Sequence, residues 1–383
     1  MDMTFPPPRH IVLNGNLCWD FWNYRPGIVR ALLAAGYRIT VLAPLDDTRP
    51  RVEAMGAAVY GIDFDRGSMN PVADLRLIQL YRQALSRLRP DMVINFGIKP
   101  VIYGGLAARW CGIPAAAVVT GLGSAFIRGG WLSRLASGLY RVGLDSAKGV
   151  FFLNPYDRDF FLHKGVVAEG KTQVLPGEGV DVSHFAHRPL SALSPDVRRF
   201  LFVGRLLRDK GIFEYVRAAG HVRRQYPDVR FQVLGSLDPH NPSSITEQEL
   251  SAWIAAGDID YLGRIEDVRP SIEAAHCVVL PSYREGLPRA LLEAAAVGRP
   301  LLASDVPGCR DIIMEGENGW FCRPGDVAHL AQRLVDVIET DPSVLAAMGR
   351  RARELVCENF ADQVVARHYL DFLAAQLPHA VNT

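Results

Sequence analysis

Residues 277–303 read CVVLPSYREGLPRALLEAAAVGRPLLA and contain one complete βαβ unit. An apolar run at 277–280 is followed by a loop, by a helical pattern at 287–297 and by a second apolar run at 300–303. Two such runs joined by one helix predict parallel strands with a crossover connection. Neither run alternates with polar residues, so we expect both faces of these strands to be buried.

The same alternation extends from this unit in both directions. In the second half, further strands are expected at 200–203, 229–234 and 259–262, and helices at 210–226, 246–256, 268–275, 327–339, 343–356 and 363–377. In the first half, strands are expected at 10–14, 38–43, 58–62, 91–95, 115–120, 149–153 and 172–175, and helices at 24–35, 72–88, 100–111 and 131–147. The sequence therefore predicts an α/β protein with two doubly wound, Rossmann-like parallel sheets.

A chain of 383 residues is too long for one ordinary core, and a segment without periodicity divides it. We expect a first domain at 1–185, a linker at 186–198 and a second domain at 199–360. The helical segment at 361–383 is expected to pack back on the first domain. Doubly wound domains bind ligands at the carboxyl ends of their strands, so the active site is expected in the cleft between two facing domains.

Composition and motifs exclude several classes of protein. With 49% hydrophobic and 22% charged residues, the chain is typical of a folded protein, and no apolar run is long enough to span a membrane. Six scattered cysteines and ten histidines show no ligand spacing, so neither a metal site nor a cofactor is expected. The absence of G-x-G-x-x-G after either first strand, and of a P-loop, argues against a nicotinamide dehydrogenase and a P-loop NTPase. The N-terminus lacks a secretion signal, which indicates a cytoplasmic location.

Charge is unevenly distributed, although the net charge is only +1. Residues 1–190 carry 21 basic and 15 acidic side chains, and the remainder carries 21 basic and 26 acidic ones. A basic half is typical of a surface that meets an anionic partner, while chance variation explains the difference equally well.

The loop at 281–288 and the helix after it hold the densest group of chemically useful side chains. Glu285 lies in the loop, Gly286 permits a tight turn, and the free N–H groups of the helix that opens at Leu287 favour an anion such as a diphosphate. The carboxylate of Glu293 can accept hydrogen bonds from two hydroxyls of a ribose. The alternatives are that Glu285 caps the helix and that Glu293 is an ordinary surface residue.

A second group follows the strand expected at 200–203 and comprises Gly204, Arg205, Lys210 and Gly211. Arginine can bind two phosphate oxygens at once, and lysine supplies a point charge. Arg205 and Lys210 can therefore neutralise a diphosphate leaving group without a metal. The alternative is a solvated basic turn, which we prefer for the neighbouring Arg208.

Together these residues resemble family 4 glycosyltransferases. Glu285 and Glu293, with seven residues between them, meet the family's two-glutamate signature, and the group Gly204, Arg205, Lys210 and Gly211 meets its second signature. The resemblance implies the GT-B architecture, a nucleotide-sugar donor in the second domain and retention of anomeric configuration. It also implies catalytic roles for Arg205 and Lys210 on the diphosphate and for Glu285 beside the donor sugar, a ribose contact for Glu293, and a base-binding loop at Arg264 and Ile265.

Residues near the ends of the first-half strands are candidates for binding the sugars. Gly15 is a candidate for binding the donor, because glycine lets the backbone approach a phosphate or sugar closely. Asn16, Trp19 and Asp20 form an aromatic and polar mix suited to a sugar acceptor. A hydrophobic staple on the next helix is the alternative for the aromatic residues.

Thr120 and Gly121 begin a Thr-Gly-Leu-Gly run similar to that of enzymes that extend lipid-linked sugars in bacterial surface-polysaccharide and glycan assembly. The run 95–100 is similar to that of the same subgroup of enzymes. Its Lys99 is expected to face the acceptor's phosphates. Many family members carry a histidine near Thr120 that contacts the donor sugar, and this sequence has none there.

A row of cations accompanies the helix expected at 131–147. Arg128, Arg134, Arg141 and Lys148 recur at spacings of six and seven residues beside Trp131. On a helix they share one edge, which is typical of an interfacial helix on an anionic membrane. An ordinary amphipathic helix is the alternative, and the basic first half favours the membrane.

The sequence therefore predicts a retaining, metal-independent glycosyltransferase. It would move a hexose or N-acetylhexosamine from a UDP-sugar to a polyprenyl-diphosphate-linked sugar at the inner face of the plasma membrane, with no nucleic-acid partner. A GT-B-like UDP-sugar epimerase is one alternative, although the first half offers no convincing acid–base pair of carboxylates. A non-catalytic subunit of a membrane glycan-assembly complex is the other.

Overall fold

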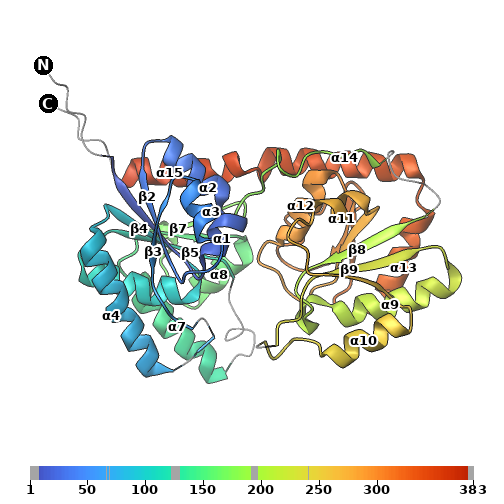
Figure 1. Ribbon diagram of the computed structural model, residues 1–383, viewed down its shortest axis with the longest axis horizontal. Coiled ribbons are helices and arrows are strands. Elements are labelled where there is room, and N and C mark those ends of the chain that lie inside the picture. Colours follow the sequence, from blue (N-terminus) through green and yellow to red (C-terminus); the bar gives the residue numbers. More distant parts are fainter. Residues whose placement is uncertain are drawn as a thin grey trace, which may run out of the picture. The chain divides into compact units, whose positions relative to one another are not determined.

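A computed structural model describes residues 8–65, 67–68, 70–121, 130–190, 197–239 and 241–377 (Figure 1). The chain divides into two compact units: unit 1 is Met1–Gly179 with Asp362–Thr383, and unit 2 is Val180–Ala361. Each unit contains one parallel sheet with helices on both faces, so the prediction of two doubly wound sheets is confirmed. None of the helices in the described residues is long and apolar enough to cross a membrane.

The sheet of unit 1 has seven strands in the order β3-β2-β1-β4-β5-β6-β7. The strands are β1 His10–Asn14, β2 Arg38–Ala43, β3 Ala58–Gly61, β4 Met92–Phe96, β5 Ala115–Val119, β6 Gly149–Phe152 and β7 Thr172–Val174. One face is covered by α4 Pro71–Leu88, the π-helix η1 Pro100–Gly104, α5 Gly105–Trp110, α7 Gly130–Leu144 and α8 Pro155–His163. Helices α1 Cys18–Asn23, α2 Pro26–Ala34, α3 Arg49–Ala54 and α15 Asp362–Gln376 form the remaining layer.

The C-terminal helix α15 completes unit 1. It packs on α2, and the ring of Tyr369 lies 5.5 Å from that of Phe151 in β6. Phe372 meets the same Phe151 ring edge-on at 5.1 Å. Aromatic contacts of this kind bury large apolar areas, which explains why a segment distant in sequence joins this core.

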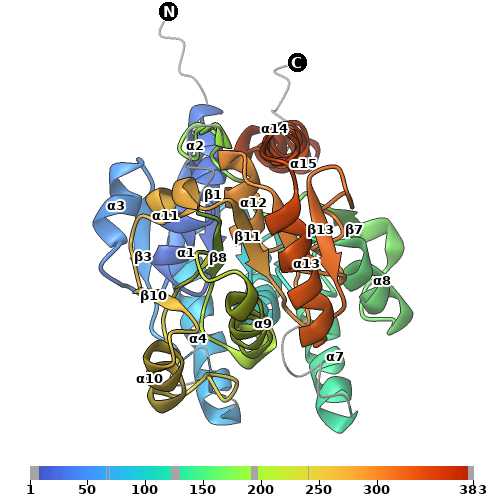
Figure 2. The same ribbon diagram turned by 90° about the vertical axis from the view of Figure 1, so that its right-hand side faces the viewer.

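The sheet of unit 2 has six strands in the order β10-β9-β8-β11-β12-β13, and Figure 2 shows β10 and β13 at its two edges. The strands are β8 Arg199–Val203, β9 Arg230–Leu234, β10 Asp260–Gly263, β11 Cys277–Leu280, β12 Leu301–Ser304 and β13 Gly319–Cys322. Helices α9 Ile212–Gln225 and α13 Val327–Glu339 pack together, as do α11 Arg269–Ala274, α12 Arg289–Val297 and α14 Pro342–Asn359. The short helix η4 Arg208–Lys210 and α10 Glu247–Ala255 complete the unit.

Unit 2 begins at Val180, before the segment that the sequence assigned to a linker. Within that segment Leu190 is buried, and Arg299 donates to the carbonyl of Arg188 at 2.7 Å. These residues therefore form part of the body of unit 2.

Both sheets reverse their strand order at one point. In unit 1 the first strand β1 lies beside β4, and in unit 2 the first strand β8 lies beside β11. Crossovers leave in opposite directions on either side of such a point, which opens a crevice at the carboxyl ends of the strands. The loops after β1, β4, β8 and β11 carry most of the residues that the sequence singled out.

Candidate functional site

The loops after β8 and β11 touch each other in unit 2. Gly211 has φ +73°, and a Cβ atom there would lie 2.0 Å from the carbonyl oxygen of Pro281. The amide of Tyr283 donates to the carbonyl of Asp209 at 3.0 Å. Only glycine combines this φ with so close an approach, so Gly211 fixes the distance between the two loops.

Lys210 and Glu285 form a partly buried ion pair where these loops meet. The Nζ atom of Lys210 lies 2.6 and 2.8 Å from the two carboxylate oxygens of Glu285. The Glu285 side chain is 7% exposed and that of Lys210 is 26% exposed. Ser282, which sequence reasoning missed, donates its hydroxyl to Glu285 at 2.6 Å. The structure thus brings together two predicted residues that lie 75 positions apart.

Glu285 does not cap helix α12. The N-cap of α12 is Pro288, in an extended conformation without a side-chain hydrogen bond, and Glu285 is engaged by Lys210 and Ser282 instead. The capping alternative is therefore wrong. The first-turn N–H groups of α12 carry the positive end of the helix dipole without a side-chain acceptor at the N-cap.

Glu293 is buried rather than on the surface. It is 8% exposed, and the Nε atom of Arg289 donates to its Oε1 at 2.7 Å. Burial raises the pKa of Glu293, and the positive charge of Arg289 offsets only part of that effect. Sequence reasoning missed Arg289, although the i,i+4 spacing from an arginine to a glutamate on a helix was the available signal.

The remaining unit 2 candidates lie around this pair at the same edge of the sheet. Arg205 is exposed and forms an ion pair with Asp238 at 2.9 Å, so its charge already has a partner. The amide of Gly204 donates to the carbonyl of Leu234 at 3.0 Å, which ties the loop after β8 to β9.

Two further loops lie at this edge. The carbonyl of Gly286 would be 2.3 Å from a Cβ atom at Gly308, so the loop after β12 packs directly on the loop after β11, and Leu287 next to it is half-buried. Arg264 and Ile265 follow β10 and are exposed, Ile265 by 40%. Their loop is joined to the end of β9 by the 2.9 Å bond from the Gly235 amide to the Gly263 carbonyl.

In unit 1 the predicted residues Gly15 and Asn16 follow β1. A Cβ atom at Gly15 would lie 2.5 Å from the ring of Phe21, so that ring occupies the space which the glycine leaves open. The side chain of Asn16 lies against Gly97 after β4, where φ is +86°. Beneath them Asn14 donates to Asn95 at 2.7 Å between the two neighbouring strands.

Trp19 and Asp20 lie half-buried in α1. The amide of Trp19 donates to a carboxylate oxygen of Asp46 at 2.9 Å, and its ring meets Tyr24 edge-on at 4.9 Å. Thr120 and Gly121 follow β5 and are half-buried. The rest of the Thr-Gly-Leu-Gly run lies outside the described residues.

Lys99 is paired with Asp74, which Tyr103 holds in turn, and sequence reasoning missed both of these side chains. Its Nζ atom lies 2.8 Å from one oxygen of Asp74 in α4, and the hydroxyl of Tyr103 donates to the other oxygen at 2.7 Å. Lys99 is 11% and Asp74 15% exposed. Burial, and then the hydrogen bond to Asp74, raise the pKa of Tyr103 well above its ordinary value, so it stays a donor to Asp74.

Helix α7 exposes Trp131 by 69% and Leu135 by 52%, with Arg134 exposed between them. Arg141 is exposed too, but its guanidinium donates to the carbonyls of Gly165 and Lys164 at 2.9 and 3.1 Å. It therefore contacts the end of α8.

The expected row of cations is not continuous. Helix α7 ends at Leu144, so Lys148 lies beyond it, where its amide donates to the carbonyl of Ala115 at 2.8 Å. The prediction that Lys148 shares the helix edge is wrong, because pairing with β5 starts a strand there. Arg128 lies outside the described residues.

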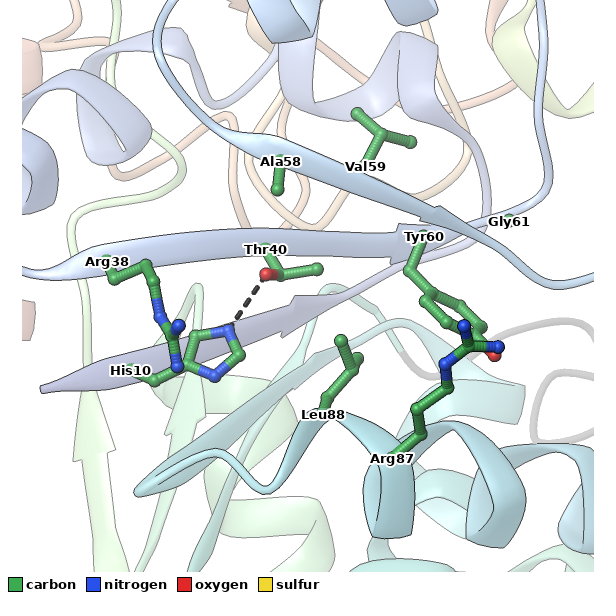
Figure 3. A pocket seen from close by; sticks show the side chains of 9 residues that line it. All are labelled: His10, Arg38, Thr40, Ala58, Val59, Tyr60, Gly61, Arg87 and Leu88. Atoms are coloured by element: carbon green, nitrogen blue, oxygen red, sulfur yellow. Dashed lines mark hydrogen bonds between the residues drawn. The ribbon is translucent and has the colours of Figure 1, made fainter.

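Two cavities are found among the described residues of unit 1. The larger, of about 570 Å³, is lined by His10, Arg38, Arg87 and their neighbours and includes none of the predicted site residues (Figure 3). The smaller, of about 380 Å³, includes Lys99. Among the described residues, no three histidine, cysteine, aspartate or glutamate side chains gather as they would to hold a metal ion.

Two family models match most of this chain. "Glycosyl transferase 4-like domain" matches residues 22–178, and "Glycosyl transferases group 1" matches residues 197–340. Together they cover every strand of the two sheets except β1.

Two relatives match over most of their length. A Campylobacter jejuni protein named N,N'-diacetylbacillosaminyl-diphospho-undecaprenol alpha-1,3-N-acetylgalactosaminyltransferase is 26% identical over 92% of this chain and 94% of its own. An Escherichia coli protein named UDP-Gal:alpha-D-GlcNAc-diphosphoundecaprenol alpha-1,3-galactosyltransferase is 26% identical over 74% of this chain and 75% of its own. The solved structure of Anabaena HepE with UDP has a TM-score of 0.78 at 18% identity, over 96% of this chain and all of that one, and shares the fold.

Proposed function

This chain belongs to the group 1 glycosyl transferases of the GT-B fold, and on that premise we propose which sugar-transfer reaction it performs. The donor is a UDP-sugar, and a hexose or N-acetylhexosamine passes to a hydroxyl of a polyprenyl-diphosphate-linked sugar. The anomeric configuration of the transferred sugar is retained. The names of the Campylobacter and Escherichia relatives support the diphosphate-linked acceptor, and the Escherichia name supports UDP.

The partly buried pair of Lys210 and Glu285 carries this proposal. An ammonium group has three donors, and Glu285 takes two of them, so one remains for a phosphate oxygen. Arg205 and the uncapped first turn of α12 supply further positive potential at the same edge of the sheet. Positive groups fixed before the reaction stabilise a departing diphosphate without a reorganisation cost.

In the proposed reaction one bond at the anomeric carbon is replaced by another on the same face of the sugar. The bond from the anomeric carbon to the diphosphate oxygen breaks, and a bond to the acceptor oxygen forms. The acceptor's proton passes to the leaving diphosphate, so no protein base is required. In this scheme Glu285 lies beside the donor sugar and holds Lys210 in place, and catalysis comes mainly from stabilising the leaving group.

Donor recognition is assigned to the rest of unit 2. Glu293 accepts hydrogen bonds from the ribose hydroxyls, and Arg289 fixes the orientation of its carboxylate. The exposed loop of Arg264 and Ile265 is assigned to the uracil base. Gly204, Gly286 and Leu287 bring backbone atoms close to the donor.

Acceptor recognition is assigned to unit 1. Its candidates are Asn16, Trp19 and Asp20 near β1, Lys99 after β4, and Thr120 and Gly121 after β5. A polyprenyl tail stays in a bilayer, so unit 1 must reach the inner face of the plasma membrane. The exposed residues Trp131, Arg134 and Leu135 of α7 are assigned to that contact.

The membrane assignment is tested by sedimentation with vesicles of varied anionic lipid content. The variant Trp131→Ser/Arg134→Glu should lose most of the binding, and added salt should weaken it in the wild type. Arg224→Glu, an equal charge change on an exposed residue of α9 in unit 2, is the matched control. A folded double variant that binds as well as the wild type would remove α7 from the membrane contact.

The transfer reaction is tested by UDP release with and without a diphosphate-linked sugar acceptor. The proposal expects release of UDP only when the acceptor is present. Epimerisation of the UDP-sugar without an acceptor would favour the epimerase alternative. Failure to bind any nucleotide sugar in a calorimetric panel of UDP-, GDP- and ADP-sugars would favour the non-catalytic subunit.

A further inference from the structure

The smaller cavity of unit 1 lies between the segment after β3 and one face of α4. Helix α4 contributes Ala73, Arg76, Leu77, Leu80 and Gln83, whose spacings of three and four residues place them on the same side of the helix. Ile62, Phe64 and the polar residues around them line it from the segment after β3, and Lys99 comes from the loop after β4. The cavity therefore joins α4 to the loop at which unit 1 reverses its strand order.

The lining combines charges of both signs with apolar side chains. Lys99 and Arg76 are its cations, and Asp63 and Asp65 are its carboxylates. Phe64 supplies an aromatic ring, which packs against the ring of Tyr81 at 6.2 Å. The two carboxylates would repel an anion that has no hydroxyl groups to donate to them, and a neutral sugar would leave the two cations without a partner. The lining therefore fits a ligand that has both an anionic group and hydroxyl groups.

Lys99 is preorganised for a phosphate. Asp74 fixes its ammonium group, and Tyr103 holds the other oxygen of Asp74, so the three side chains support one another. One bond to Asp74 leaves the ammonium two further donors. An immobilised cation of this kind binds a ligand without paying for the ordering of its side chain.

We propose that this cavity binds the glycosyl-diphosphate head of the acceptor. Lys99 and Arg76 contact the phosphate oxygens, Asp63 accepts hydrogen bonds from hydroxyls of the sugar, and Phe64 packs on its apolar face. The cavity volume of about 380 Å³ falls in the range of small-molecule sites. The inference rests on the proposed function, and it adds Arg76, Asp63 and Phe64 to the acceptor residues.

The larger cavity provides a built-in control. It shares Tyr60 and Gly61 with the smaller one, and Arg87, from the same helix α4, lines it (Figure 3). Among the described residues no carboxylate lines this cavity. It therefore has no carboxylate that could play the part proposed for Asp63, which accepts hydrogen bonds from the sugar's hydroxyls. Arg87 and Arg76 are both exposed, which makes Arg87→Gln the matched partner of Arg76→Gln.

The experiment compares two acceptors that carry the same sugar. One is a short-chain prenyl-diphosphate-linked N-acetylhexosamine, and the other is its alkyl glycoside without phosphate. Arg76→Gln should raise the KM of the diphosphate acceptor about tenfold, the usual effect of losing a charged hydrogen bond, and leave the KM values of the alkyl glycoside and the UDP-sugar unchanged. Arg87→Gln should change none of the three, and Asp63→Asn should raise the KM of both acceptors.

The outcomes separate this inference from the proposed function. If the wild type transfers sugar to the diphosphate acceptor and Arg76→Gln does so with the same KM, the cavity is not the acceptor site, while the proposed function stands. An equal rise for both acceptors would likewise overturn the phosphate contact. A wild type that transfers to neither acceptor contradicts the proposed function and this inference with it.

Discussion

Replacing Lys210 by alanine tests its role in catalysis separately from its role in folding. Glu285, with its side chain 7% exposed, would keep the hydroxyl of Ser282 as its only side-chain donor among the described residues. Breaking a fully buried pair costs about 3–5 kcal/mol, and the partial exposure of Lys210 lowers this to about 2–3 kcal/mol. For a unit of this size we expect the melting temperature to fall by roughly 5–10 °C, so the variant remains folded at 25 °C.

The expected loss of turnover is larger than the loss of stability explains. A fixed donor facing charge that develops on a leaving group is worth about 3–4 kcal/mol, so kcat should fall by roughly 10²- to 10³-fold. The assay is acceptor-dependent UDP release at saturating substrates, with circular dichroism to verify folding. Arg208→Ala is the control, since Arg208 lies in the same turn but is 51% exposed and pairs with Glu249. A folded Lys210→Ala protein with near-normal kcat would refute the leaving-group role.

Three further predictions concern metal, loop contact and pH. Excess EDTA should leave turnover unchanged, because protein cations and the α12 N-terminus neutralise the diphosphate, and a loss that Mg²⁺ restores would contradict this. Gly211→Ala should destabilise unit 2 by clearly more than Gly257→Ala. Gly257 has the same φ of +73°, but no atom lies within 4 Å of the new Cβ there. Equal losses of stability in thermal unfolding would show that the contact between the two loops is unimportant. Burial raises the pKa of Glu293 above 4.5, so its contribution to stability is full below that pH and is lost as pH rises through the folded value. The unfolding free energy of wild type minus that of Glu293→Gln should therefore decrease as pH rises above about 4.5. A difference that grows with pH would refute the raised pKa.

The strands were the most predictable part of the fold. Apolar runs at 10–14, 38–43 and 277–280 coincide with β1, β2 and β11, because strands buried on both faces show no polar alternation. The four-residue strand β13 was missed, since its pairing with β12 supplies what its short sequence does not signal. The π-helix η1 was predicted as ordinary helix, and its conformation accompanies the packing of Gly143 of α7 onto Ile102, a tertiary effect.

The site residues of unit 2 were predictable singly but not as pairs. Lys210 and Glu285 each follow an apolar run, which marks them as residues at the carboxyl end of a sheet. That they meet depends on β8 lying beside β11, and strand order is not encoded in local patterns. The burial of Glu293 and the ion pair between Lys99 and Asp74 also depend on packing between elements that are distant in sequence.

The stereochemistry of one turnover tests the central claim most directly. Wild-type protein is incubated with an α-linked UDP-sugar and a prenyl-diphosphate-linked sugar, and the new glycosidic bond is examined by the one-bond coupling constant and chemical shift of its anomeric carbon and proton. The account predicts an α-linked product that forms only when both substrates are present and that forms roughly 10²- to 10³-fold more slowly in Lys210→Ala. A β-linked product would contradict the same-face transfer on which the roles of Lys210 and Glu285 depend.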